Sequence, residues 1–86
     1  MPYITPAARE ALDSGRTPET AGELNYLFSR LASEYLVHMG LNYQHINDIV
    51  GALEGAKLEL YRRVAINYEG RKLDKNGDVY SKRVLL

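Results

Sequence analysis

The chain has 86 residues, with eleven Lys and Arg against eleven Asp and Glu, and it has no cysteine. A chain this short buries only about 60–65% of its unfolded surface, so a self-sufficient core is marginal, and no disulfide supports it. Small scaffolds of this kind often rely on association with other chains. A hydrophobic content of 45% argues against wholesale disorder. With no apolar run of membrane-spanning length and no signal-like start, we expect a cytoplasmic protein without a membrane partner.

Charge is unevenly distributed along the chain. Residues 1–56 carry three arginines against seven acidic residues, a net charge of −4, whereas residues 57–86 carry eight basic against four acidic residues, a net charge of +4. The asymmetry is typical of an anion bound at the basic end or of contact between oppositely charged parts of two subunits. The alternative is solvated surface charge. Because acidic residues interrupt the basic stretch throughout, bulk nucleic acid is not expected as a partner.

The first predicted element is a short helix that ends near Leu12. Thr5 precedes Pro6, and Pro is favoured at the first helical position, while Gly15 lies just past the expected end. Residues 1–16 therefore form an N-terminal segment.

A longer helix is predicted to start within TPETAGEL and to end near Met39. Thr20 and Glu23 have capping-box spacing, and Gly40 is a natural stop. Thr17 before Pro18 offers a second register for the start. Leu24, Leu27, Phe28, Leu31, Tyr35 and Met39 form one apolar stripe at three-and-four spacing.

The second long helix is predicted to begin near Asn42 and to run uninterrupted to the Asn76-Gly77 turn. At ~1.5 Å per residue it spans about 50 Å, against about 30 Å for the first. The short connection makes the two helices antiparallel neighbours, so the second must overhang the first. Its overhanging turns are apolar and need a partner; they contain Leu60, Tyr61, Val64, Ala65, Ile66 and Tyr68. The alternative is that the short N-terminal helix covers part of this overhang.

These patterns predict an all-α protein. The expected architecture is an antiparallel helical hairpin with a short N-terminal helix and an overhanging long second helix, in a homo-oligomer. The whole chain, 1–86, reads as a single helical domain, with the hairpin at 17–76 and a C-terminal tail at 77–86 that is either a short strand or a docking segment.

Catalysis finds little support in the sequence. The chain has no cysteine nucleophile, its serines lack a recognisable His/Asp setting, and there is no Gly-rich phosphate loop. His38 and His45 flank the interhelical connection without a clear carboxylate partner, so they read as loop-end residues. Glu54 and Glu59 point about 140° apart on a helix, which does not suit a shared Mg²⁺. We therefore expect no enzyme activity, cofactor or metal.

Binding chemistry is better represented. Arginine suits phosphate, and tyrosine suits a base or a ribose. The candidate phosphate contacts are Lys57, Arg62, Arg63 and Arg71; the candidate stacking or sugar contacts are Tyr26, Tyr61 and Tyr68; Asn25 is a candidate for reading a base edge. These residues cannot all face one ligand from one straight helix, so a site needs several subunits or the first helix. The alternative is that Glu59 pairs with Arg62 or Arg63 and that the tyrosines fill an interface.

Three stretches carry a family resemblance: TPETAGELNYLFSRL, NYQHINDIVGALEGAKLELYRRV and YEGRKLDKNGDVY. With them the chain resembles a family of small, uncharacterised proteins common in bacteriophages and prophages. The tail SKRVLL runs beyond the usual end of that family. The resemblance implies a cytoplasmic setting in an infected or lysogenic bacterial host.

The expected architecture and setting are also similar to those of phage sponge proteins, which sequester nucleotide immune signals. The function that this implies is anti-defence: sequestration of a small nucleotide-derived signal in inter-subunit pockets, without catalysis. The alternative is a structural or protein-interaction subunit that docks on a host or phage protein.

Overall fold

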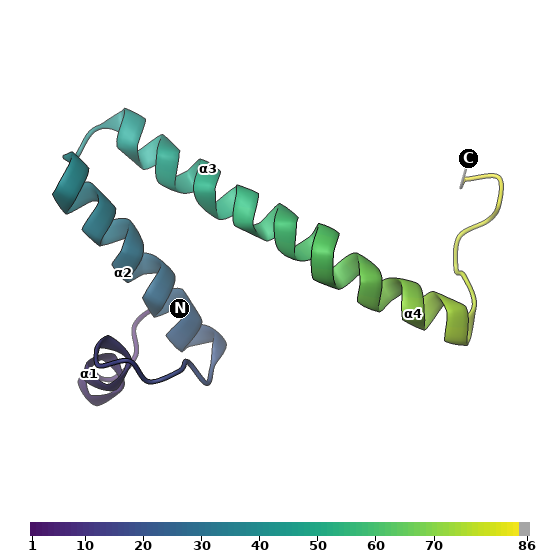
Figure 1. Ribbon diagram of the computed structural model, residues 1–86, viewed down its shortest axis with the longest axis horizontal. Coiled ribbons are helices and arrows are strands. Elements are labelled where there is room, and N and C mark those ends of the chain that lie inside the picture. The colour runs from purple at the N-terminus through teal and green to yellow at the C-terminus, as the bar shows by residue number, and fades with distance from the viewer. Residues whose placement is uncertain (85–86) are drawn as a thin grey trace. The chain divides into compact units, whose positions relative to one another are not determined.

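The computed structural model describes residues 1–84. In chain order they form α1 (Pro6–Asp13), α2 (Ala21–Met39), α3 (Tyr43–Leu60), the π-helical segment η1 (Tyr61–Ala65) and α4 (Ile66–Asn76) (Figure 1). The described residues contain no strand, which confirms the predicted all-α class. The chain divides into two units, Met1–Ile49 and a second that begins at Val50. Each is described by itself.

Helix α1 begins where the sequence predicts. The Oγ1 atom of Thr5 accepts a hydrogen bond from the backbone N–H of Ala8 at 3.2 Å, and Pro6 is the first helical residue. Gly15, two residues past the end, has a φ of 106°, a conformation that favours glycine. The predicted short helix is confirmed, with its end one residue later than expected.

Helix α2 is also confirmed, in the Thr20 register. The backbone N–H of Glu23 donates to Oγ1 of Thr20 at 3.1 Å, as in a capping box. The Glu23 carboxylate, however, accepts from the backbone N–H of Glu19 at 2.9 Å, one residue before the cap. At the other end Gly40 has a φ of 102° and donates its N–H to the carbonyl of Leu36. Local capping chemistry thus sets both ends.

The core of the first unit is small. Leu12 of α1 is 3% exposed and is the one buried residue among residues 1–84. Along the predicted apolar stripe of α2, Phe28 is 50% exposed and Leu31 is 58% exposed. The residues of the predicted stripe are therefore helical, but about half of the surface of these side chains is exposed to solvent.

The third predicted helix starts as expected. Oδ1 of Asn42 accepts from the backbone N–H of His45 at 2.9 Å, and Ile46 donates to the Asn42 carbonyl. Residues from Tyr43 to Asn76 are then helical without a gap, and Gly77, with a φ of 88°, ends the run.

The helix runs without interruption as predicted, but its hydrogen-bond pattern changes at Tyr61–Ala65. There the backbone N–H of Ile66 donates to the carbonyl of Tyr61, five residues back, and the side chain of Asn67 donates to the Arg63 carbonyl at 2.8 Å. A π-helical turn adds one residue to the repeat, so the residues after it are rotated by about 100° from their α-helical positions. Side chains before and after this segment are therefore not related by the 3.6-residue repeat of an α-helix.

Almost every residue that the structure describes in the second unit is exposed. Of residues 50–84, Ala65 alone is partly covered, and none is buried. Residues 77–84 form turns and a bend, so the strand predicted as one option for the tail is wrong for that part; residues 85–86 lie outside the described residues. The antiparallel packing, the overhang and the oligomer stay predictions. None of the helices in the described part has the length and apolar character to cross a membrane.

Candidate ligand-binding surface

The eight predicted site residues fall into both units. Asn25 and Tyr26 lie on α2 in the first unit. The other six lie in the second unit: Lys57 on α3, Tyr61, Arg62 and Arg63 on η1, and Tyr68 and Arg71 on α4. The two sets are therefore described separately.

Tyr26 is engaged in a contact between α1 and α2. Its hydroxyl lies 2.9 and 3.0 Å from the two carboxylate oxygens of Asp13, and Arg30 donates to the same carboxylate at 2.9 Å. The bond from Arg30 and then the bond from Tyr26 lower the pKa of Asp13, while the bond to Asp13 raises the pKa of Tyr26. Asn25 accepts from the Ser29 hydroxyl at 3.3 Å. In the first unit the Tyr26 hydroxyl thus stabilises the fold.

Two predicted phosphate contacts have carboxylate partners one helical turn away. Nζ of Lys57 lies 3.2 Å from Glu54, and Arg62 lies 3.4 Å from Glu59. The second pair is the alternative that the sequence offered for Arg62. Both pairs are exposed, and exposed pairs contribute little to stability. A phosphate group can therefore compete for these cations at small cost.

The remaining predicted residues of the second unit are also exposed. Arg71 and Lys72 lie 5.7 and 5.8 Å from the centre of the Tyr68 ring, within cation–π range. Within residues 50–84, Arg63, Arg71 and Lys72 have no carboxylate partner within ion-pair distance, since the ion pairs of that unit are those of Lys57 and Arg62. Tyr61 is exposed on the same π-helical segment as Arg63.

Lys72 lies in the basic stretch that the sequence singles out, but its contact with the Tyr68 ring was not predicted. Its four-residue spacing from Tyr68 on a helix was the available signal, because such residues are neighbours on a helix surface. We call residues 57–72 the basic–tyrosine segment. It offers donors for phosphate and rings for stacking.

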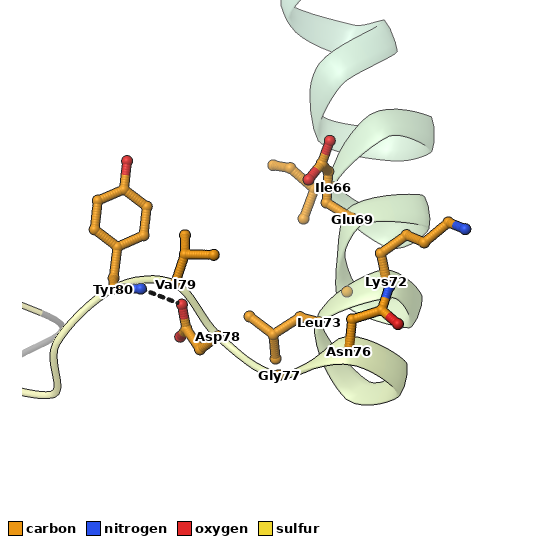
Figure 2. A pocket seen from close by; sticks show the side chains of 10 residues that line it. Ile66, Glu69, Lys72, Leu73, Asn76, Gly77, Asp78, Val79 and Tyr80 are labelled. Atoms are coloured by element: carbon orange, nitrogen blue, oxygen red, sulfur yellow. Dashed lines mark hydrogen bonds between the residues drawn. The ribbon is translucent and has the colours of Figure 1, made fainter.

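A shallow groove at the end of α4 was also not predicted. It has a volume of about 480 Å³, and Figure 2 shows Leu73 and Ile66 of α4 on one side of it and Val79 and Tyr80 of the tail on the other. The backbone N–H of Tyr80 donates to the Asp78 carboxylate at 2.8 Å, which holds the turn after Gly77. The Asn-Gly-Asp sequence was the signal for the turn; nothing in it indicates a groove.

His45, beside the connection between α2 and α3, has structural contacts. Nδ1 of His45 lies 2.7 Å from the carbonyl oxygen of Gly40, so this nitrogen carries the hydrogen. The His45 ring meets the Tyr35 ring edge-on, and the Tyr35 hydroxyl donates to Asp48 at 3.0 Å, which raises the pKa of Tyr35. In residues 1–84 no three His, Asp or Glu side chains gather in a way that could hold a metal ion.

Comparison with known proteins places the chain in a family. Residues 1–79 match the family described as a domain of unknown function, DUF6899, and the chain belongs to it. The match covers all the helices and stops just before Tyr80, so most of the tail lies outside it. No curated protein and no solved structure matches the chain.

Proposed function

We propose that the chain is a non-catalytic binding protein that works as a homo-oligomer and sequesters a small nucleotide-derived signal on its basic–tyrosine segment. The observation that carries the proposal is the exposure of the apolar side chains. Leu12 is buried, whereas twenty-three large hydrophobic residues in residues 1–84 are exposed. Burial of apolar surface contributes about 25 cal/mol per Å², and soluble proteins rarely leave so much uncovered. Association of copies would cover it.

The chemistry of the segment supports an anionic, aromatic ligand. Arg63 and Arg71 have guanidinium groups without a carboxylate partner in residues 50–84, and such groups bind phosphate through two parallel hydrogen bonds. Tyr61 and Tyr68 supply exposed rings on which a base can stack. Cations and rings from neighbouring copies would complete a pocket that one helix cannot form.

The resemblance to phage and prophage proteins supports an anti-defence role for this binding. A bacterial host under phage attack makes nucleotide signals. A protein that binds them without turnover lowers their free concentration by one molecule for each binding site. The proposed place of action is the cytoplasm of an infected or lysogenic host. No cofactor is needed for such a role.

The test is native mass spectrometry of the protein after incubation with a nucleotide panel and with extract from phage-infected bacteria. We expect a multimer that carries a few hundred daltons per site, released unchanged on denaturation. The Arg63→Ala plus Arg71→Ala variant should lose at least about tenfold in affinity and keep the multimer. The matched control removes two charges elsewhere, Arg9→Ala plus Arg83→Ala, and should bind as the parent does. An empty multimer in every condition contradicts the ligand assignment.

A second candidate function is a protein-interaction subunit, and the groove at the end of α4 favours it. Apolar side chains of α4 and of the tail line this groove (Figure 2). Removal of residues 77–86 should then abolish retention of a host or phage protein in a pull-down. Val79→Asp, inside the groove, should do the same, whereas Val84→Asp, outside it, should not. Retention unchanged by the deletion contradicts this candidate.

A further inference from the structure

The two units of the chain carry opposite charge. Met1–Ile49 holds three arginines against six acidic residues, a net charge of −3. The unit that begins at Val50 holds eight basic against five acidic residues, a net charge of +3. Each unit therefore has an excess of the charge that the other lacks.

Ion pairs inside each unit do not remove this excess. In the first unit, Arg16 contacts both Glu19 and Glu23, at 2.6 and 3.0 Å. Arg30 contacts both Asp13 and Glu34, at 2.9 and 3.6 Å. Each of these two arginines is thus shared between two carboxylates, which leaves a negative surface.

In the second unit the balance is reversed. Lys57 and Arg62 have one carboxylate each, and the other six basic residues in residues 50–84 have no ion pair there. Lys72 and Lys75 belong to this unpaired set and lie in the last turns of α4. The unit therefore presents a positive surface.

Both charged surfaces lie beside exposed apolar side chains. Leu24, Phe28 and Leu31 of α2 are about half exposed, and so are Leu53, Leu60 and Val64 in the second unit. A contact between the two kinds of unit would remove apolar area from water and bring opposite charges together. A contact between like units would bring like charges together, which is unfavourable.

We infer that two copies associate antiparallel, with the acidic unit of each copy on the basic unit of the other. This inference rests on the proposed homo-oligomer and adds its arrangement. Two such contacts are related by a two-fold axis, so the assembly closes as a dimer and leaves no free complementary surface. The opposite charges fix the antiparallel register and favour encounter of the copies.

The test uses two charge-reversed variants of the full chain. Glu10→Lys plus Glu34→Lys changes the first unit from −3 to +1, and Lys72→Glu plus Lys75→Glu changes the second unit from +3 to −1. All four residues are exposed. Lys72 belongs to the basic–tyrosine segment, so the test measures association and does not measure ligand binding. Association is measured by sedimentation equilibrium, and helix content by circular dichroism.

Each variant alone should dimerise at least about tenfold more weakly than the parent, because both contacts then join like charges. An equal mixture of the two should restore dimerisation, since both contacts of the mixed dimer join opposite charges again. The control Glu69→Lys plus Asp74→Lys has the same net charge as the first variant, but it makes the basic unit more basic. It should dimerise at least as tightly as the parent.

Three results would overturn the inference. If the single variants associate like the parent, the arrangement is wrong while the homo-oligomer stands. If the mixture stays monomeric but all four changes in one chain restore the parent's state, the contact forms within a chain. A monomeric parent overturns the proposed homo-oligomer and the arrangement together.

Discussion

The hydroxyl of Tyr26 donates to the carboxylate of Asp13, 2.9 and 3.0 Å from its two oxygens. The bond joins α2 to the last residue of α1, and Arg30 donates to the same carboxylate. Because α1 contributes the one buried side chain of the described residues, Leu12, this polar contact and that apolar contact act together to hold the short helix.

Tyr26→Phe should loosen α1 without altering the other helices. The change removes the hydroxyl and leaves the ring, so Asp13 keeps only the bond from Arg30. The pKa of Asp13 should then rise toward its ordinary value, since the Tyr26 bond is one of the causes that lower it. An NMR titration of the Asp13 carboxyl carbon measures this. Tyr43→Phe, at an exposed position, is the control and should leave that titration unchanged.

Loss of the α2 cap should cost measurable stability. Thr20→Ala removes the acceptor for the Glu23 N–H and leaves that donor without its side-chain partner. Cap losses of this type cost about 0.5–2 kcal/mol in the free energy of unfolding. The measurement is urea denaturation at fixed chain concentration, because association shifts the apparent stability. Thr17→Ala, near the other predicted start, is the matched control and should unfold as the parent does. An equal loss of stability in both variants would contradict a specific role for the Thr20 cap.

The first unit should lose stability in acid. The pKa of Asp13 is lowered from 3.8 by Arg30 and Tyr26, and the pKa of Glu23 is lowered from 4.5 by Arg16 and the Glu19 N–H. The folded form therefore binds these protons less readily than the unfolded form. Their stabilisation is complete above the unfolded values and is lost as the pH falls through the folded ones.

The same unit should also lose stability in base. The pKa values of Tyr26 and Tyr35 are raised from 10.0 by bonds to Asp13 and Asp48, so their contribution to stability is present below pH 10 and is lost as the pH rises through the folded values.

Both pH predictions are measured by thermal unfolding across pH. The unfolding temperature should be constant at intermediate pH and should fall on the acid side and on the base side. Asp13→Asn should flatten part of the acid flank, whereas Glu10→Gln on the same helix should follow the parent. A profile with no acid flank in the parent would contradict the role of these carboxylates.

Helix boundaries were predictable because capping signals are local. Thr5 with Pro6, Thr20 with Glu23, and Gly40 each act over a few residues, and the structure has them at the predicted ends. The contacts of Tyr26 were not predictable, because Asp13 is thirteen residues away on another helix. The π-helical turn at Tyr61–Ala65 was missed for a different reason: a change from four-residue to five-residue hydrogen bonds leaves no mark in the apolar pattern.

The candidate surface was predictable in composition but not in detail. The sequence identified the basic and tyrosine residues, and it offered the Glu59–Arg62 pair as an alternative. It did not separate Arg62, which has a carboxylate partner, from Arg63, which has none within residues 50–84. That distinction depends on the direction in which each arginine side chain leaves the helix, and the π-helical segment changes this direction.

Glycine-to-alanine changes should have opposite effects at two kinds of position. Gly51 and Gly55 lie inside α3, and a Cβ atom built on either meets nothing within 4 Å. Alanine there should stabilise the helix by about 0.5–1 kcal/mol per site, because glycine costs that much in a helix interior. Gly40 also has open space around it, but its φ of 102° disfavours any residue with a Cβ. Gly40→Ala should therefore destabilise the chain. Thermal unfolding of dilute protein, where association is weak, measures the change in stability for each variant. A higher unfolding temperature for Gly40→Ala would contradict the prediction at that position. A lower unfolding temperature for Gly55→Ala that is seen only in concentrated protein would show that contacts between copies decide the outcome there.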